Sequence, residues 1–292
     1  FFGEKTWEKA ESAMQKTVLQ RALEKAELTP EDLDYILAGD LLNQCIGSSF
    51  GLRDFRVPFY GLYGACSTMG ESLSLASLLI DGGYADRAAA LTSSHFCTAE
   101  RQYRMPVPYG SQRTPTAKWT TTAAGCTILG SDGPGPYVTH VTCGRIVDKG
   151  ITDANNMGAA MAPAAYDTLS AFFRDTGYKP ADFDLILTGD LGELGHAIVR
   201  DFFQRDGVDM GPQFQDCGLL LYDRKHQDMH AGASGCGCSA SVLNGYLLAE
   251  MRRGKWKNIL FAPTGALLSP TSSFQGESVP GICHVVQISM KK

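Results

Sequence analysis

The stretch PEDLDYILAGDL at residues 30–41 returns as PADFDLILTGDL at residues 180–191, with eight of the twelve positions identical and a constant offset of 150 residues. In each copy a turn that begins at a proline leads into a short apolar run, and the run ends at Gly-Asp. This order is typical of a buried strand that is followed by a polar loop. We therefore expect an internal duplication of the chain.

Each copy follows a segment with helical periodicity. Apolar residues recur at helical spacing from Trp7 to about Glu27 and from about Ala164 to Thr176. Gly177 stands where a helix C-cap belongs, and Pro180 prevents continuation of the helix. The repeating unit is therefore helix, turn, strand and polar loop.

A second correspondence joins residues 64–95 to residues 236–266, at an offset of 171. Each stretch shows a small-residue turn, a helix, a turn centred on glycine and a buried strand. The 21 extra residues of the second half are expected to form a hairpin within residues 217–234, with its turn near residues 224–228. A third pair, AAGCTILG and PGICHVVQI, is expected to form the closing strand of each half.

Helices that alternate with short buried strands predict an α/β fold with mostly parallel sheets. The duplication predicts two pseudo-twofold-related halves, residues 1–135 and residues 136–292, joined at SDGPGP. The second half opens with the strand-like run PYVTHVTCGRIV, and the first half begins almost directly at its helix. We expect that the residues shown lack a native N-terminal segment that contains the opening strand.

Composition narrows the class of protein. The net charge is −5 and the pI is about 5.7, so nucleic-acid binding has no electrostatic support. No apolar run is long enough to span a bilayer. Nine cysteines in a large chain predict free thiols in a reducing compartment. The sequence is that of a soluble intracellular globular protein.

The duplicated unit, with Cys66 at the strand-to-helix turn of the first half, resembles the thiolase and ketoacyl synthase superfamily. Seven motifs in order are similar to the stage V sporulation protein AD family: AGDLLNQ, GACST, TSSH…TAERQ, AMAPAA, LILTGDL, DCGLL and APTGALLSPT. The resemblance covers the whole chain. It implies a thiolase-like duplicated αβα layered fold.

The resemblance also implies a function. Members of the family are associated with binding dipicolinic acid (pyridine-2,6-dicarboxylate) and with its uptake into the developing spore. For this chain we expect that ligand, with or without calcium, membrane-embedded partners of the same uptake complex, and a forespore or cytoplasmic location at the spore inner membrane. We also expect a homodimer, paired through the strand RAAALTSSH at a sheet edge.

Cys66 has two opposed interpretations. A helix N-terminus lowers the pKa of a thiol and can hold an anion. Condensing enzymes of the superfamily add two partners from the second half, but the matching loops here offer Asp190, Cys236 and Cys238 and no histidine. A nearby acid raises the pKa of a thiol. Condensation is therefore not expected, and the alternatives are an acyltransferase or ketoacyl-synthase-like enzyme with Cys66 as nucleophile, or a scaffold with a vestigial pocket.

The sequence favours a ligand-binding protein over an acyltransferase or a scaffold. The segment at residues 93–119 combines cations with aromatic residues, which suits a planar aromatic dianion. We expect dipicolinate between the halves, with one carboxylate near Cys66 and the other near His95 or an arginine. The predicted ligand-binding residues are Cys66, His95, Arg101, Arg104, Asp190, Cys236 and His284.

No metal or cofactor is predicted. His226 and His230 precede Cys236-x-Cys238 and superficially resemble a zinc site. The two pairs fall on separate predicted elements, and zinc needs tetrahedral convergence of its ligands.

Overall fold

The computed structural model describes residues 1–103 and 113–292. The predicted ligand residue Arg104 lies outside the described residues. In the first half the helices and strands are α1 (Trp7–Ala26), β1 (Tyr35–Gly39), α2 (Ile46–Leu52), β2 (Phe59–Gly61), α3 (Thr68–Asp81), β3 (Arg87–Ser94), α4 (Phe96–Tyr103), β4 (Trp119–Thr120) and β5 (Ala123–Gly130).

The second half begins with β6 (Tyr137–Cys143), α5 (Met157–Thr176), β7 (Leu185–Thr188), α6 (Gly192–Arg205) and β8 (Phe214–Asp216). It continues with α7 (Cys217–Leu220), β9 (Ala233–Ser234), α8 (Cys236–Val242), a π-helical turn (Leu243–Leu247) and α9 (Leu248–Arg252). It ends with β10 (Asn258–Ala262), β11 (Thr264–Ala266), α10 (Pro270–Phe274) and β12 (Gly281–Ser289).

The helices α1 and α5 show the duplication directly, because both have 20 residues and their bounds differ by 150. Thr6 caps the first turn of α1, and the Asn156 side chain accepts the N–H of Ala159 at the start of α5. α5 therefore begins at Met157, seven residues before the predicted start. Gly177, at φ 75°, ends the helix as expected.

The two main sheets repeat one strand order. The first runs β2-β1-β3-β5 and the second runs β8-β7-β10-β12, with β6 added on the far side of β12. In each sheet the closing strand, β5 or β12, is antiparallel to its neighbour β3 or β10. The predicted α/β fold with two related halves is confirmed.

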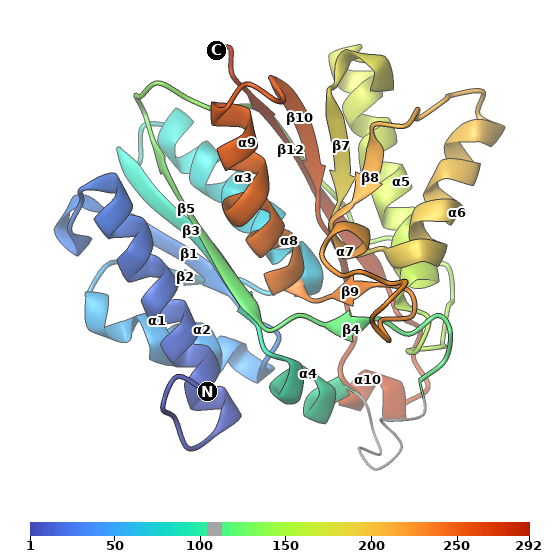
Figure 1. Cartoon of the computed structure of the whole chain (residues 1–292), viewed down its shortest axis with the longest axis horizontal. Coiled ribbons are helices and arrows are strands. Elements are labelled where there is room, and N and C mark those ends of the chain that lie inside the picture. Colours follow the sequence, from blue (N-terminus) through green and yellow to red (C-terminus); the bar gives the residue numbers. More distant parts are fainter. Residues whose placement is uncertain (104–112) are drawn as a thin grey trace.

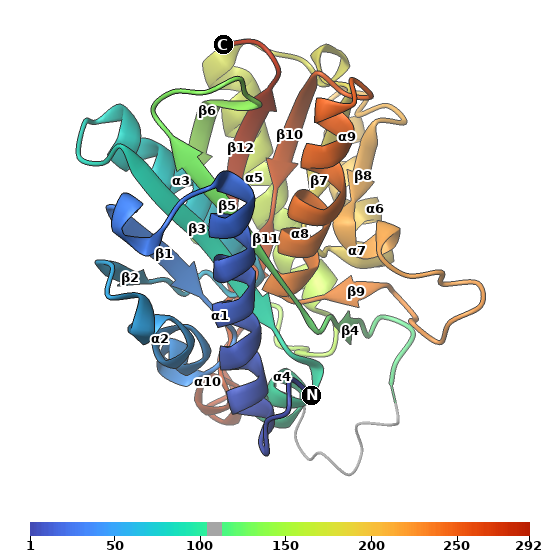
Figure 2. The ribbon, with the colours of Figure 1, turned by 60° about the vertical axis from the view of Figure 1, so that its left-hand side comes forward.

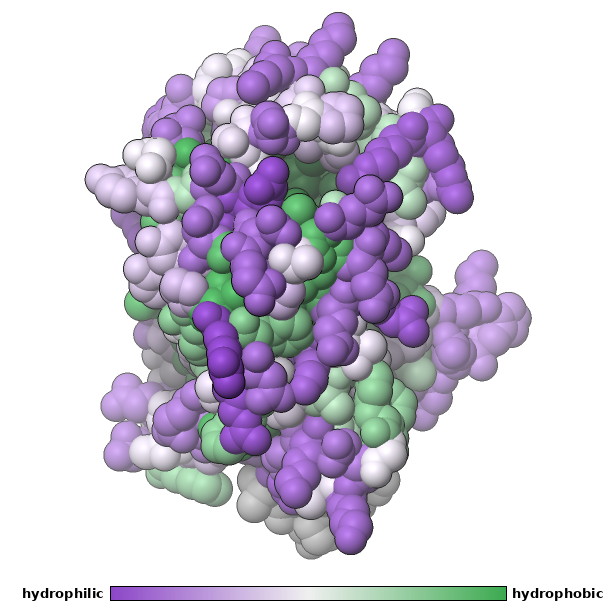
Figure 3. All heavy atoms as spheres, turned by 90° about the vertical axis from the view of Figure 1, so that its left-hand side faces the viewer, coloured by the Kyte–Doolittle hydropathy of each residue, from purple (hydrophilic) through white to green (hydrophobic). Residues whose placement is uncertain are grey.

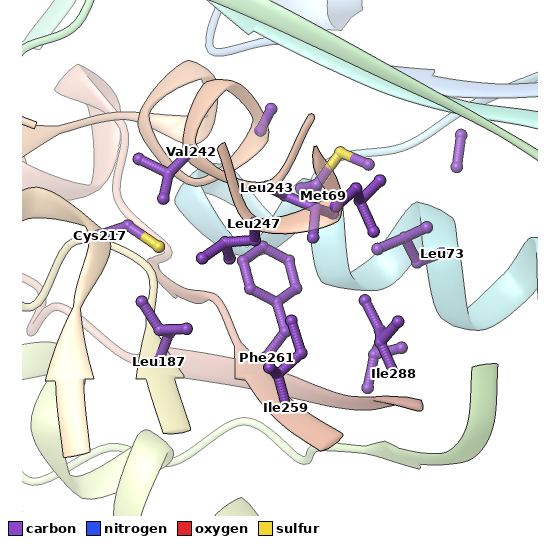
Figure 4. Close-up of a cluster of buried hydrophobic side chains, with 14 of the residues drawn as sticks. Met69, Leu73, Leu187, Cys217, Val242, Leu243, Leu247, Ile259, Phe261 and Ile288 are labelled. Carbon is purple, nitrogen blue, oxygen red and sulfur yellow. The ribbon is translucent and has the colours of Figure 1, made fainter. Parts of the chain in front are cut away.

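Five layers build the molecule (Figure 1). α1 and α2 cover the outer face of the first sheet, and α5 and α6 cover the outer face of the second. α3, α8 and α9 lie between the sheets. The core there takes Met69 and Leu73 from the first half, and Leu247, Phe261 and Ile288 from the second (Figure 4). The hydrophobic cluster between the two sheets is therefore built by both halves.

The predicted hairpin within residues 217–234 and the predicted sheet-edge position of RAAALTSSH are both wrong. Residues 217–234 form no hairpin, since α7 opens this segment and β9 closes it by pairing in parallel with β4 of the first half. The strand β3 is no sheet edge, because β1 and β5 flank it (Figure 2). β3 therefore cannot pair across a twofold, and homodimerisation stays a prediction.

One face of the molecule carries an apolar hollow bordered by hydrophilic side chains (Figure 3). Within the described residues β5 has no strand on its outer edge, whereas its counterpart β12 is paired there by β6. A groove of about 700 Å³ lies beside β5, and its lining includes Ile128, Leu129, Leu243 and Ile288.

None of the helices in the described residues is long and apolar enough to cross a membrane.

Candidate ligand-binding site

A cavity lies where the two halves meet near the start of α3. Its empty volume, part of which is open to solvent, is about 450 Å³, and only about 40 Å³ admits the centre of a water molecule. Its lining comes from both halves: Leu41, Tyr63, Ala65, Cys66, Ala99, Glu100, Tyr103, Thr120, Met157, Ser234, Ala266 and Leu268. The walls are largely apolar, with hydroxyl groups and one carboxylate among them.

Cys66 reaches the cavity from a 3₁₀ turn (Ala65–Ser67) that leads into α3. The residue is 6% exposed. β11 packs closely behind this turn, and a Cβ atom at Gly265 would overlap the carbonyl oxygen of Gly64 and lie 3.1 Å from the Cys66 nitrogen. The absence of a side chain at position 265 thus lets the second half approach the start of α3.

Asp190 and Lys118 form a buried ion pair beside Cys66. Lys118 Nζ lies 3.4 Å from Asp190 Oδ2 and also donates to the Asp190 carbonyl oxygen. The same Oδ2 accepts the N–H of Gly235 at 2.9 Å and the hydroxyl of Ser234 at 3.1 Å. Burial, and next the Asp190 carboxylate, raise the pKa of the Cys66 thiol well above its ordinary value, while Lys118 opposes this in part. The thiol is therefore protonated at neutral pH.

Cys236 cannot take the proton of Cys66. It begins α8 and is fully buried, and its Sγ donates to the carbonyl oxygen of Ser93 at 2.9 Å. Burial, followed by the neighbouring Cys66, raises the pKa of the Cys236 thiol. The structure brings Cys66, Asp190 and Cys236 together, and among the described residues no imidazole acts on the Cys66 thiol.

Two phenols form part of the cavity wall. Tyr103 donates to the carbonyl oxygen of Leu41 at 2.6 Å, and the hydroxyl oxygens of Tyr63 and Tyr103 lie 2.6 Å apart. Because Tyr103 gives its single hydrogen to Leu41, Tyr63 must donate to Tyr103. Burial raises the pKa of both phenols, that of Tyr63 to about 12. Both therefore stay neutral, and Tyr63 holds a donor that a ligand can redirect.

Two other predicted ligand residues do not line this cavity. His95 follows β3, its Nδ1 accepts the N–H of Cys97, and its ring meets the Phe1 ring edge-to-face. Burial lowers the pKa of His95, so the ring is neutral at pH 7. Arg101 pairs with Glu8 and stacks over Trp7, on the side of α4 that faces α1.

His284 also lies away from the cavity. It stands in β12 opposite Cys143 of β6, and its two ring nitrogens have no hydrogen-bond partner among the described residues. Burial lowers the pKa of His284 to about 4. Within the described residues no group of three His, Cys, Asp or Glu side chains is placed to hold a metal ion. Ligand binding by the seven predicted residues stays a prediction.

Sequence reasoning missed several parts of the cavity. Lys118 belongs to the cation-bearing segment at residues 93–119, and the structure makes it the partner of Asp190. Met157, the first residue of α5, lies in the cavity wall. A lysine between apolar neighbours, directly before the β4 strand, was the available signal. Tyr63 and Ser234 carried no sequence signal beyond their place next to small-residue turns.

The fold is similar to that of solved synthase structures. The OleA structure from Xanthomonas campestris matches with a TM-score of 0.64 at 13% identity, over 95% of this chain and 81% of that chain. The 3-oxoacyl-(acyl carrier protein) synthase III, FabH, from Pseudomonas aeruginosa matches with a TM-score of 0.61 at 14% identity, over 97% and 84%. The protein therefore has a thiolase-like fold.

Sequence comparison identifies the family of the protein within this fold class. The model of the stage V sporulation protein AD family matches residues 1–289. Stage V sporulation protein AD of Bacillus subtilis (strain 168) is 46% identical over 284 residues, which is 97% of this chain and 83% of that protein. The chain belongs to the stage V sporulation protein AD family, as its seven motifs predicted.

Proposed function

We propose that this protein binds dipicolinic acid in the cavity beside Cys66 and supports the uptake of that acid into the developing spore. Membership of a sporulation family supports the biological setting. The geometry of the cavity supports a binding role rather than acyl transfer.

One observation carries the proposal: Cys66 faces a buried Asp190–Lys118 pair where a transferase would need a base. Formation of a thiolate beside a carboxylate is unfavourable, since the two negative charges repel each other in a desolvated site. An acyltransferase reaction through Cys66 would need that thiolate. A cavity with a protonated thiol offers instead a small, weakly polar surface.

The lining suits a planar acid. Apolar side chains such as Leu41, Met157 and Leu268 can hold the two faces of a pyridine ring. The hydroxyls of Tyr63 and Thr120 can turn toward carboxylate oxygens. The space open to water centres, about 40 Å³, holds a few water molecules at most. The wall must therefore move outward to admit the ring.

Calorimetric titration with dipicolinate, beside an isomeric pyridine dicarboxylate and with or without calcium, tests the proposal. Cys66→Ala should weaken binding only modestly, and Cys66→Trp should abolish it by filling the cavity. The matched control is Cys143→Trp, because Cys143 is an exposed thiol on β6. Wild-type affinity in Cys66→Trp would place the ligand elsewhere.

Two variants separate the predicted from the observed lining. Arg101→Ala removes a cation that pairs with Glu8 outside the cavity, whereas Tyr103→Phe alters the wall. If the cavity is the site, Tyr103→Phe should change dipicolinate affinity more than Arg101→Ala. The reverse order would favour a site at the outer side of α4.

We further propose that the protein acts as a homodimer beside membrane-embedded partners at the spore inner membrane. β2 forms the edge of the first sheet, and Phe59 and Tyr60 on it are 39% and 51% exposed. An exposed aromatic edge strand is a liability unless another chain covers it. Light scattering at micromolar concentration should show a dimer that Tyr60→Lys disrupts and Tyr84→Lys, at a residue 74% exposed, does not.

A further inference from the structure

A second buried polar cluster lies behind the cavity, between α1 and α4. Glu11 and Gln15, one helical turn apart on α1, are both 0% exposed. The two carboxylate oxygens of Glu11 contact hydroxyls, Oε1 with Ser93 at 3.0 Å and Oε2 with Thr98 at 2.7 Å. Gln15 Nε2 donates to Ser93 Oγ at 3.0 Å and to Ser48 Oγ at 2.8 Å.

The hydroxyl of Thr98 has too few hydrogens for its contacts when Glu11 is charged. Thr98 Oγ1 contacts both Glu11 Oε2 and the carbonyl oxygen of His95, at 2.7 and 2.9 Å. A hydroxyl has one hydrogen, and a carbonyl oxygen has none to give. If Glu11 is charged, two acceptors compete for the hydrogen of Thr98. If Glu11 is protonated, Glu11 donates to Thr98 and Thr98 donates to His95, so every contact is satisfied.

The nearest carboxylate, Asp40, does not need this proton. Asp40 accepts the N–H of Leu42 at 2.9 Å, and the N–H and the hydroxyl of Ser48 at 2.7 and 2.6 Å. Burial raises the pKa of Asp40, but backbone N–H groups can only donate, so these bonds oppose that shift and favour a charged Asp40. Glu11 contacts only hydroxyls, which turn either way. The proton of this acid pair therefore belongs on Glu11.

Among the residues that the structure describes, no cation pairs with Glu11. The titratable groups near it are Asp40 after β1, Cys236 at the start of α8, and His95, one turn before Thr98. No ion pair among the described residues involves Glu11. Burial, and then the charge of Asp40, raise the pKa of Glu11 to about 8.

The fold itself does not require an acid here. In the duplicated helix α5 the residue 150 positions further on is Met161, which is also 0% exposed. A methionine thus fills the corresponding place in the second half. The acid in the first half contacts Thr98 of α4, which carries the cavity-wall residues Ala99, Glu100 and Tyr103.

We propose that Glu11 is a positioning residue of the cavity: its carboxyl, held in the protonated form, donates to Thr98 and fixes α4 against α1. Loss of that proton frees α4 and with it the Tyr103 wall. The link to ligand binding rests on the proposed function, but the link between Glu11 and α4 does not.

Hydrogen exchange of the α4 amides, expressed as protection factors from pH 5 to pH 9.5, tests the proposal on the whole chain. Opening of α4 should release the proton of Glu11 between its ordinary pKa and its raised one. Protection in the wild type should fall by up to about tenfold per pH unit toward pH 8 and then level off. Glu11→Gln, which keeps a donor and an acceptor, should show constant protection. The control Glu24→Gln, at an exposed acid on α1, should behave like the wild type.

Glu11→Met copies the residue of α5 and removes the donor. This variant should lower the protection of the α4 amides at every pH, whereas Glu11→Gln should keep it. An infrared band of a protonated carboxylic acid at pH 7 that persists in Asp40→Asn and disappears in Glu11→Gln would locate the proton directly. The absence of that band, or identical pH profiles in wild type and Glu11→Gln, would overturn the proposal.

Dipicolinate titration at pH 6 separates the two proposals. Glu11→Gln should bind like the wild type and Glu11→Met more weakly. If no form binds dipicolinate while the exchange profiles differ as expected, the proposed function fails and the positioning role of Glu11 stands.

Discussion

Lys118 Nζ lies 3.4 Å from Asp190 Oδ2, and the two side chains are only 3% and 1% exposed. Residue 118 comes from the first half of the chain and residue 190 from the second. The pair thus joins the two halves directly beside Cys66. A buried pair of this kind is most costly when one partner is removed alone, since the other charge is left without water or counter-ion.

Lys118→Met should therefore lower the free energy of unfolding by about 3–5 kcal/mol. Asp190 would keep its donors from Ser234 and Gly235 but lose its counter-ion. Urea unfolding at pH 7 measures the change. The double variant Lys118→Met, Asp190→Asn should recover part of the loss.

Lys16→Met is the matched control, because Lys16 pairs with Asp54 at the surface, where the two side chains are 41% and 61% exposed. It should change stability little, since water screens exposed pairs. An equal effect of the two substitutions would mean that burial of the Lys118–Asp190 pair has no energetic consequence.

The duplication could be predicted from the sequence because the same local sequence pattern occurs twice. Residues 30–41 and 180–191 repeat turn and strand chemistry, and the offset of 150 residues also separates the bounds of α1 and α5. Once the halves are known to be copies, the order of one sheet predicts that of the other. The alternation of helices and buried strands therefore determines most of the fold.

The cavity could not be predicted as well from the sequence, because its contacts join residues far apart in the chain. Arg101 and Lys118 look alike as cations of one segment, yet Arg101 pairs with Glu8 on the outside and Lys118 is buried against Asp190. The predicted hairpin failed for the same reason. Its end, β9, pairs with β4 from the other half, and no local pattern reveals that partner.

His284 should make the protein sensitive to mild acid. Its pKa is about 4 in the folded protein and about 6.5 in an unfolded chain. The unfolded state therefore binds more protons between these values, and stability falls as the pH drops from 6.5 to 4. The loss amounts to about 3 kcal/mol. In His284→Asn this part of the pH dependence should be absent from unfolding curves measured between pH 7 and pH 4.

His226→Asn provides the comparison, because the His226 side chain is 80% exposed. That variant should keep the acid sensitivity of the wild type. Parallel curves for wild type and His284→Asn would show that the His284 ring is hydrated in the folded protein.

Gly265→Ala should disturb the contact between β11 and the start of α3. The added methyl group would overlap the Gly64 carbonyl oxygen and crowd the Cys66 nitrogen. Overpacking of this kind costs about 1–3 kcal/mol, measurable by thermal or urea unfolding. Gly245→Ala is the control, because a Cβ there meets no atom within 4 Å. That control should be neutral or slightly stabilising.

The last prediction concerns the thiol itself. Because burial and Asp190 raise the pKa of Cys66, its alkylation should be slow below pH 9, and incubation with acetyl-CoA should leave no adduct on it. Asp190→Asn removes the repelling charge and should speed alkylation of Cys66 at a given pH. Lys118→Met removes the charge that favours the thiolate and should slow it.

Peptide mapping by mass spectrometry in a Cys143→Ser background measures both effects, since Cys143 is exposed and would otherwise react. The opposite responses of the two variants matter most, because simple loosening of the cavity would speed alkylation in both. A stoichiometric acetyl adduct that disappears in Cys66→Ala would overturn the binding role. It would show that the Asp190 carboxylate, despite its charge, can take the proton of Cys66 and make the thiol a nucleophile.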